Sequence, residues 1–156
     1  MKAMKAKEER MQELVIQFVA AAVATVSFSL LFGVPRHYYP FGGLIGAAGW
    51  VVYLLLESCG TGTTESILVA TMIVSFLSRF AAVRCRCPVT VFLIAGIIPL
   101  VPGAGIYWST YYLVTDQITL AAQSGFSAVK SAIAIVLGSV LIAEIPQKWF
   151  RIGMKK

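Results

Sequence analysis

Residues 87–115 read CPVTVFLIAGIIPLVPGAGIYWSTYYLVT, a run of 29 residues without a single ionisable Asp, Glu, Lys, Arg or His. As one α-helix this run would be about 43 Å long, whereas the hydrocarbon core of a bilayer is about 30 Å thick. Its middle, PLVPGAG at 99–105, holds two prolines and two glycines, and proline removes a helical hydrogen bond. The sequence therefore predicts a membrane segment over 88–115 that is discontinuous at this Pro/Gly motif.

The rest of the chain is similarly apolar. Of its 156 residues, 58% are hydrophobic and only 13% are charged, and the mean hydropathy is +0.82. Soluble domains are about a quarter charged. Four further runs have the length of about 20 residues that a spanning helix needs: 14–34, 38–56, 64–83 and 124–145. We predict an all-α polytopic membrane bundle over 14–147, with about five transmembrane segments and the fourth one broken.

Charged residues gather at the ends of these segments. Residues 1–13 form a charged extension that mixes Glu8, Glu9 and Glu13 with basic residues, which is not typical of a secretory signal, so we expect a helix at the membrane surface. Residues 148–156 are predicted to be a basic cytoplasmic tail. If all five segments cross, the positive-inside rule favours an outer N-terminus and an inner C-terminus. If the fourth segment is re-entrant, both termini are inside, and the charges do not separate the two topologies.

Backbone that is not helical is tolerated at membrane depth only where it is buried in protein or lines a wet cavity. A break at 99–105 would expose carbonyl groups around 97–100 and amide N–H groups around 103–106, with opposite partial charges. These ends suit a zwitterionic or anionic metabolite whose carboxylate meets the N–H groups. The alternative is a proline kink that shapes the bundle and binds nothing. The predicted substrate-binding residues are Pro99, Pro102, Gly103, Ala104, Gly105, Tyr107, Thr110 and Tyr111.

The aromatic residues after the break have a second interpretation. Trp108, Tyr111 and Tyr112 could instead form an aromatic belt at the membrane interface. Ionisable residues in or beside the spans are candidates for ion or proton coupling, since a carboxylate whose pKa is raised by burial can take up a proton. These candidates are Glu144, Asp116, Glu57 and Arg79. For Arg79 a role at a helix end is an equal alternative.

Small residues indicate close helix packing in the second segment. Gly42, Gly46 and Gly49 form a face of the GxxxG type, which lets another helix backbone approach closely, within the chain or from a partner. Five helices also make only half of a transporter built from two repeats. We therefore expect a second subunit, self-association, or both.

Several classes of protein are disfavoured. Catalytic motifs are absent, and His37 is the single histidine, so we predict no enzyme, no catalytic residue and no cofactor. Cys59, Cys85 and Cys87 lack the spacing of a zinc site and are expected to be reduced thiols, with no metal bound. The net charge of +6 follows the expected topology, so nucleic acid is not an expected partner.

Four short stretches carry a resemblance to a known family. FGVP at 32–35, GGLIG at 42–46, PVTV at 88–91 and GIIPLVPGAGIY at 96–107 resemble the threonine/serine exporter family over about 14–153. More narrowly, the chain resembles the separate small subunit that corresponds to the C-terminal half of the fused exporters. The resemblance implies a bacterial cytoplasmic membrane location and a larger partner subunit that matches the N-terminal half. It also implies export of threonine, serine or small dicarboxylates such as succinate.

The residues and the resemblance together lead to one hypothesis. The chain is a subunit of a secondary exporter of small hydrophilic metabolites, which works by alternating access with a second subunit around the broken fourth segment. The alternative is a membrane scaffold or assembly subunit that holds the larger partner and transports nothing itself.

Overall fold

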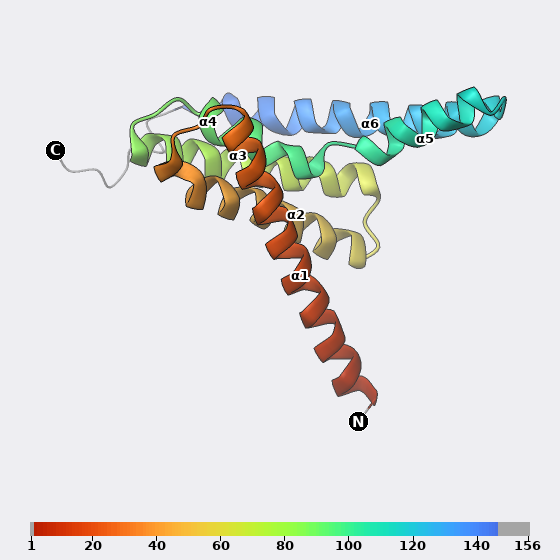
Figure 1. Ribbon diagram of the computed structural model, residues 1–156, viewed down its shortest axis with the longest axis horizontal. Helices are drawn as coiled ribbons and strands as arrows, with labels where there is room; N and C mark the ends of the chain where they lie inside the picture. Colours follow the sequence, from red (N-terminus) through yellow and green to blue (C-terminus); the bar gives the residue numbers. More distant parts are fainter. Residues whose placement is uncertain (1, 147–156) are drawn as a thin grey trace.

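A computed structural model describes the backbone of residues 2–146 and the side chains of residues 8–146. In this part of the chain all regular structure is helical, as predicted (Figure 1). Two short 3₁₀ helices, η1 (Arg36–Tyr38) and η2 (Ile98–Leu100), accompany the α-helices. The α-helices are α1 (Lys2–Leu31), α2 (Tyr39–Ser58), α3 (Thr63–Cys85), α4 (Thr90–Ile97), α5 (Gly103–Val114) and α6 (Ile118–Ala143).

Four of these helices, α1, α2, α3 and α6, are long and apolar enough to cross a membrane. The pair Thr90–Leu100 and Gly103–Val114 passes the same test together but is bent by 50° at its break, which makes a fifth potential span. The prediction of about five segments with a broken fourth is confirmed. The predicted basic tail at 148–156 lies outside the described residues.

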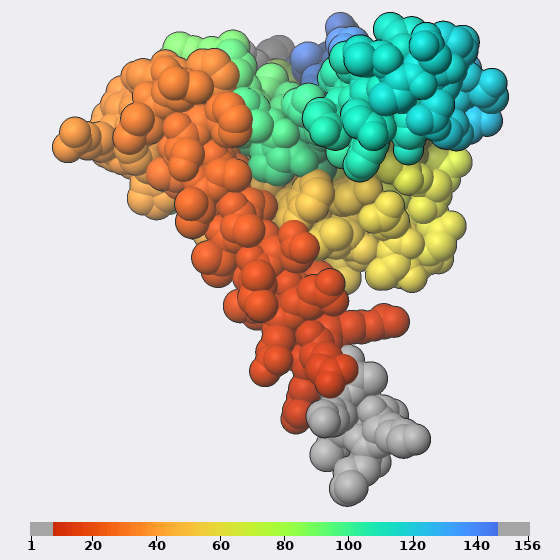
Figure 2. Space-filling model, turned by 45° about the vertical axis from the view of Figure 1, so that its right-hand side comes forward, coloured from red at the N-terminus to blue at the C-terminus, as the bar shows by residue number. Residues whose placement is uncertain are grey.

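Helix α1 continues without a break through the predicted N-terminal extension. It runs from Lys2 to Leu31 as one helix of 30 residues, about 45 Å long. Figure 2 shows the red N-terminal part of α1 standing away from the rest of the chain. From Lys2 onward, the charged segment is therefore a helical continuation of the first span.

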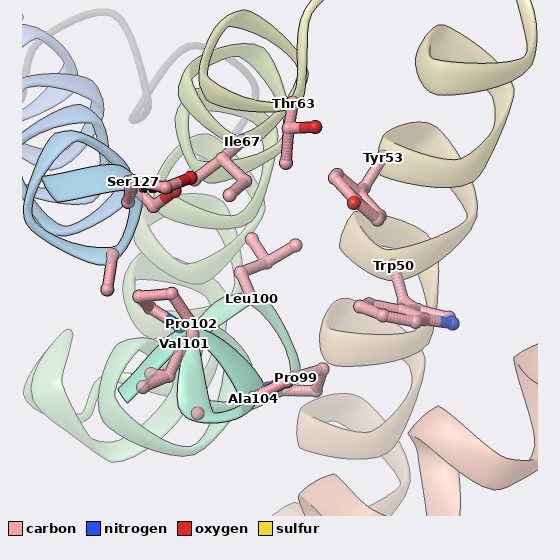
Figure 3. A pocket seen from close by; sticks show the side chains of 14 residues that line it. Trp50, Tyr53, Thr63, Ile67, Pro99, Leu100, Val101, Pro102, Ala104 and Ser127 are labelled. Atoms are coloured by element: carbon pink, nitrogen blue, oxygen red, sulfur yellow. Dashed lines mark hydrogen bonds between the residues drawn. The ribbon is translucent and has the colours of Figure 1, made fainter. Parts of the chain in front are cut away.

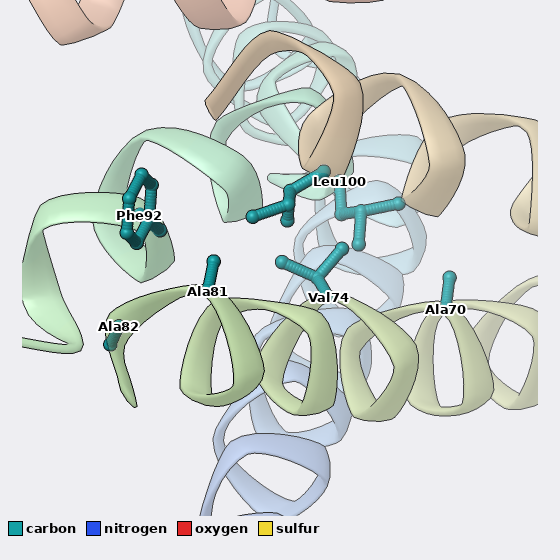
Figure 4. Packing of buried hydrophobic residues seen from close by; sticks show 7 residues of the cluster. Ala70, Val74, Ala81, Ala82, Phe92 and Leu100 are labelled. Atoms are coloured by element: carbon teal, nitrogen blue, oxygen red, sulfur yellow. The ribbon is translucent and has the colours of Figure 1, made fainter. Parts of the chain in front are cut away.

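The core lies where α2, α3 and α4 meet. Ala70 and Val74 of α3 and Phe92 of α4 are fully buried, and Leu100 of η2 joins them (Figure 4). The ring of Phe92 also makes an edge contact with Tyr38, with 5.5 Å between the ring centroids. Leu100 therefore anchors the first half of the broken segment in the core, immediately before the break.

The predicted packing glycines lie against helices of the same chain. A Cβ atom at Gly46 would overlap Oγ1 of Thr25 in α1, and a Cβ atom at Gly42 would lie 3.4 Å from Oγ of Ser29. A Cβ atom at Gly49 would instead overlap Cγ2 of Val74 in α3. These glycines thus allow α2 to approach α1 on one side and α3 on the other.

Helices α3 and α6 run parallel to each other. A Cβ atom at Gly138 of α6 would lie 2.9 Å from the carbonyl oxygen of Leu68, and farther along Arg79 donates hydrogen bonds to the last carbonyls of α6. Between the end of α3 and the start of α6, the chain must return along the bundle, and α4 and α5 carry it back (Figure 1). If α3 and α6 both cross the membrane, this course makes α4 and α5 together one broken span.

The two ends of the bundle differ in charge. The α1–α2 connection lies beside the start of α4, so Arg36, Arg84 and Arg86 share one end, which we call the basic end. The α2–α3 connection and the α5–α6 turn, with Glu57 and Asp116, lie at the opposite end. There the hairpin of α5 and α6 extends past the other helices (Figure 1).

Candidate functional site

The break in the fourth segment has a defined backbone geometry. Helix η2 ends at Leu100, and Val101 is extended, with φ −64° and ψ 131°. Pro102 follows with φ −76° and ψ 55°, the conformation of an inverse γ-turn, and the amide of Gly103 donates to the carbonyl of Val101 at 2.7 Å. Proline has no N–H to donate to the preceding turn, so the helix stops at Leu100 and restarts at Gly103.

This break leaves backbone groups of both signs unpaired. Among the described residues, no group accepts a hydrogen bond from the amides of Ala104 and Gly105, and none donates to the carbonyls of Pro99 and Leu100. The first amides of a helix carry partial positive charge and the last carbonyls partial negative charge. Such groups at helix ends need a partner from outside the helix, which a polar ligand or water can provide.

A cavity of about 260 Å³ lies at the break (Figure 3). Predicted residues form one wall: Pro99, Pro102, Gly103, Ala104 and Gly105. The other walls come from distant parts of the sequence that our sequence analysis missed: Trp50 and Tyr53 of α2, Thr63 and Ile67 of α3, and Ser127, Ala128 and Ser131 of α6. No sequence pattern links these residues to the Pro/Gly motif, because tertiary packing alone brings them together.

A polar network lies behind the aromatic wall of the cavity. The hydroxyl of Tyr53 donates to Oε1 of Glu57 at 3.0 Å, and Oγ1 of Thr63 lies 3.5 Å from the same oxygen. Nε1 of Trp50 donates to Oε1 of Gln17 in α1 at 3.1 Å, and the rings of Trp50 and Tyr53 lie 5.2 Å apart. Among the predicted coupling residues, Glu57 is thus the one whose carboxylate is bonded to the cavity wall.

Three predicted substrate-binding residues lie away from the cavity. Tyr107 and Tyr111 are stacked on the exposed face of α5, with 6.4 Å between the ring centroids, and Tyr107 is 62% exposed. The hydroxyl of Thr110 donates to the carbonyl of Ile106 in its own helix at 3.0 Å. Together with Trp108, the tyrosines make an aromatic surface on α5. This arrangement fits the alternative interpretation of these residues as an aromatic belt at the membrane interface.

The remaining predicted coupling residues lie at helix ends. Asp116 is in the α5–α6 turn with a left-handed φ of 57°, and Glu144 is the exposed residue that follows α6. Arg79 donates to the carbonyl of Ala143 at 2.8 Å and also to that of Ile142. The structure does not bring Asp116, Glu144 or Arg79 to the cavity.

A row of hydroxyl groups follows α3 from the turn after Ile67, which lines the cavity, toward the basic end. Thr71, Ser75 and Ser78 of α3 are buried, and Ser75 lies 3.5 Å from the half-buried Ser139 of α6. The hydroxyls of Thr71 and Ser78 have no hydrogen-bond partner in the described part of the chain. We call Thr71, Ser75, Ser78 and Ser139 the hydroxyl seam. Thr71, Ser75 and Ser78 recur at the spacing of one helix face, and this pattern in the sequence could have indicated the seam.

The cysteines lie at opposite ends of the bundle. Cys59 is exposed between α2 and α3, whereas Cys85 at the end of α3 and Cys87 shortly after it are half-buried, and all three are free thiols. Burial, followed by the neighbouring Cys85, raises the pKa of the Cys87 thiol. Within residues 8–146 no group of three His, Cys, Asp or Glu side chains is placed to hold a metal ion.

Comparison with known proteins places this geometry in context. A family model described as "Threonine/Serine exporter, ThrE" matches residues 17–145. A protein of Haemophilus influenzae, described as uncharacterized, is 29% identical over 97 residues, which make up 62% of this chain and 33% of that protein. The match thus spans about a third of the relative's length. No solved structure matches the chain significantly.

Proposed function

Because the chain belongs to the threonine/serine exporter family, whose members are membrane transporters and not enzymes, we propose that it is one subunit of a secondary exporter. The substrates are threonine, serine or small dicarboxylates such as succinate, and the location is the bacterial cytoplasmic membrane. A second, larger subunit that corresponds to the N-terminal half of the fused exporters completes the transporter. The cavity at the broken helix is the observation that carries this proposal.

Size supports both the subunit and the substrate parts of the proposal. Five potential spans equal one repeat of a transporter with two repeats, and the Haemophilus relative is longer than the segment it shares with this chain. Ligand pockets for drug-sized molecules measure about 300–1,000 Å³, so a cavity of 260 Å³ suits a smaller metabolite. In this proposal the substrate carboxylate accepts hydrogen bonds from the free amides of Ala104 and Gly105.

The break also suggests which parts move. Leu100 is held in the core, whereas α5 packs on α6, where a Cβ atom at Gly105 would lie 3.2 Å from Cβ of Ala128. We propose that α5 and the first half of α6 move as one unit about residues 101–102 and expose the cavity alternately to the two ends. The hydroxyl seam then provides polar groups between the cavity and the basic end.

The predicted site residues that lie outside the cavity also have roles in this proposal. Tyr107, Thr110 and Tyr111 lie on the face of α5 that a second subunit would cover. Glu57, Asp116 and Glu144 remain the carboxylates to test for proton coupling, because proton-driven export requires a group that titrates. Arg79 donates a hydrogen bond to the end of α6, so its coupling role is tested last.

The direct test measures metabolite export by cells that lack the gene for this chain. Cells are fed peptides containing threonine and serine, and internal and released threonine, serine and succinate are followed over time. We expect at least one of these metabolites to accumulate inside the mutant and to return to normal on complementation. Normal export of all three would refute the transport function.

The scaffold alternative needs a second comparison. The larger subunit is reconstituted into liposomes with and without this chain, and substrate flux is measured per molecule of larger subunit. A transport role predicts little flux without this chain, because one set of five helices supplies only part of the site. Full flux from the larger subunit alone would favour the scaffold function.

A further inference from the structure

A second hollow adjoins the cavity at the break. It is an open groove of about 400 Å³ between α5 and α6, and its lining residues are Gly105, Trp108, Tyr112, Gln123, Ser124 and Ser127. We propose that this groove is a second binding site for small polar solutes and the mouth of the substrate path at the end of the bundle opposite the basic end. This inference rests on the proposed transport function and adds a site to it.

The groove and the cavity share two lining residues, Gly105 of α5 and Ser127 of α6. From these residues the groove follows the α5–α6 hairpin away from the break, as far as Tyr112 near the end of α5 and Gln123 in the second turn of α6. The hydroxyl seam follows α3 in the other direction, toward the basic end. A solute that leaves the cavity along the groove therefore reaches the end of the bundle that carries the α5–α6 turn.

The wall that α6 provides is polar, although α6 is a potential membrane span of 26 residues. In the described part of the chain, the side chains of Gln123, Ser124 and Ser127 have no hydrogen-bond partner. The hydroxyl of Ser131, one turn farther along α6, does have one, because it donates to the carbonyl of Ser127 at 3.1 Å. Polar groups that face lipid without a partner are costly. Water or a polar solute in the groove would supply the partners.

The wall that α5 provides is aromatic. Trp108 and Tyr112 lie one turn apart, and their rings are stacked with 5.8 Å between the centroids. Within residues 8–146, neither Nε1 of Trp108 nor the hydroxyl of Tyr112 has a hydrogen-bond partner. Such side chains combine an apolar ring with a polar group at one end. Together with the polar wall of α6, they suit a small metabolite that has a short carbon chain and several polar groups.

Close contacts between α5 and α6 hold the two walls in place. A Cβ atom at Gly125 would lie 2.8 Å from Oγ of Ser109, and the hydroxyl of Ser109 donates to the carbonyl of Ala121 at 2.9 Å. A Cβ atom at Gly105 would lie 3.2 Å from Cβ of Ala128. The two helices already pack closely through these small residues. The groove beside the contacts is therefore a lasting feature of the hairpin.

The test measures whether water reaches the groove in the membrane. Single cysteines are introduced into the full-length chain after its three native cysteines are replaced by serine, and each variant is expressed in its native cells. Intact and permeabilised spheroplasts are treated with a methanethiosulfonate that carries a sulfonate group and cannot cross membranes. We expect Ser124→Cys and Ser127→Cys to react about 10-fold faster than cysteines on the opposite side of α6, because a thiol in apolar surroundings forms little thiolate.

Ala122→Cys and Val129→Cys are the matched controls. Both positions are exposed and line neither the groove nor the cavity, and with about 3.6 residues per turn they lie on the opposite side of α6 from Ser127. Ala122 precedes the two serines along α6 and Val129 follows them. Depth in the membrane alone would therefore make Ala122→Cys the fastest of the four variants. Faster reaction at both serine positions than at either control is expected only if the groove is wet.

A solute that occupies the groove should slow the reaction. L-threonine, L-serine and succinate are added in turn, with mannitol as the control solute. We expect at least one of the three to slow the reaction of Ser127→Cys severalfold, and mannitol to leave it unchanged. A variant that keeps only Cys59, which is exposed at the same end of the bundle, establishes which side of the membrane this end faces.

The outcomes separate this inference from the transport function. If Ser124→Cys and Ser127→Cys react as slowly as the controls, lipid or another subunit fills the groove, and the inference is wrong while the transport function stands. Reaction from the side of the membrane opposite Cys59, or fast reaction that no candidate substrate slows, would overturn it in the same way. Normal export of every substrate by cells without the gene would overturn the transport function and, with it, the inference.

Discussion

The guanidinium group of Arg79 in α3 donates a hydrogen bond to the carbonyl of Ala143 at the end of α6, with 2.8 Å between nitrogen and oxygen. A second bond from the same nitrogen reaches the carbonyl of Ile142. The last carbonyls of a helix have no partner within the helix and carry partial negative charge, so a cation there stabilises the helix end. Arg79 thereby holds the ends of α3 and α6 together at the basic end of the bundle.

We expect Arg79→Ala to destabilise the protein by about 1.5–3 kcal/mol, the range for hydrogen bonds to charged groups. Thermal unfolding of the purified protein in detergent measures the change. Arg79→Lys should retain part of the stability, because Lys keeps the charge but lacks the planar fork. An unchanged unfolding midpoint in Arg79→Ala together with lost transport would instead support the coupling role.

Gly103 and Gly105 should respond differently to a larger side chain. Gly103 faces the cavity, and a Cβ atom there has no other atom within 4 Å. We expect Gly103→Val to fill the cavity and abolish transport with little change in the unfolding midpoint, whereas Gly103→Ala should reduce transport less. Gly105→Val would crowd Ala128 and should reduce the free energy of unfolding by about 1–3 kcal/mol. Its unfolding midpoint should therefore fall. If Gly103→Val transports substrate as fast as the wild type, the break is a structural kink and not a substrate site.

The contact between α1 and α2 depends on Gly46. A Cβ atom at this position would overlap the buried side chain of Thr25, so Gly46→Ala must push the helices apart. We expect a loss of about 1–3 kcal/mol, the usual cost of overpacking. Gly42→Ala is the control, since its Cβ atom would lie 3.4 Å from Ser29, and it should cost less. Equal unfolding midpoints for the two variants would contradict this packing.

The hydroxyl seam can be tested at Thr71, whose buried hydroxyl has no partner in the described residues. An unpaired buried hydroxyl is costly, so Thr71→Val should leave stability unchanged or increase it. If the seam serves the substrate path, the same variant should slow transport severalfold. Thr25→Val is the control, because the equally buried Thr25 hydroxyl donates to Ala21 at 2.8 Å. This control should lose some stability and keep its transport rate, and unchanged transport in Thr71→Val would exclude the seam from the path.

The free thiols report the topology of the bundle. With single-cysteine variants in spheroplasts, a maleimide that cannot cross membranes should label Cys59 from outside and Cys87 only after permeabilisation. The two residues lie at opposite ends, and in the topology with five spans the positive-inside rule favours a cytoplasmic basic end. Because burial raises the pKa of Cys87, its thiolate forms at higher pH, so its labelling should be slow near pH 7 and accelerate as pH rises. Labelling of both residues from one side would contradict a five-span topology.

Parts of the candidate site were accessible to sequence analysis and parts were not. The Pro/Gly motif predicted the break and its unpaired backbone groups, because proline acts locally on the helix that contains it. The same reasoning extended the site to Tyr107 and Tyr111 by proximity along the chain, and the structure places both on an exposed face of α5. It could not anticipate Trp50 or Tyr53, because they lie some fifty residues before the break.

The sequence by itself determined the approximate number of membrane segments, the position of the break and the distribution of charge between the ends. These properties follow from bilayer thickness and from the need to pair every backbone group in lipid, which act on each segment separately. Only the tertiary structure decided that Gly42, Gly46 and Gly49 pack within the chain and that α2, α3 and α6 enclose a cavity at the break. The physical reason is that packing depends on which small residues face each other across helices, a relation between distant positions that no single segment contains.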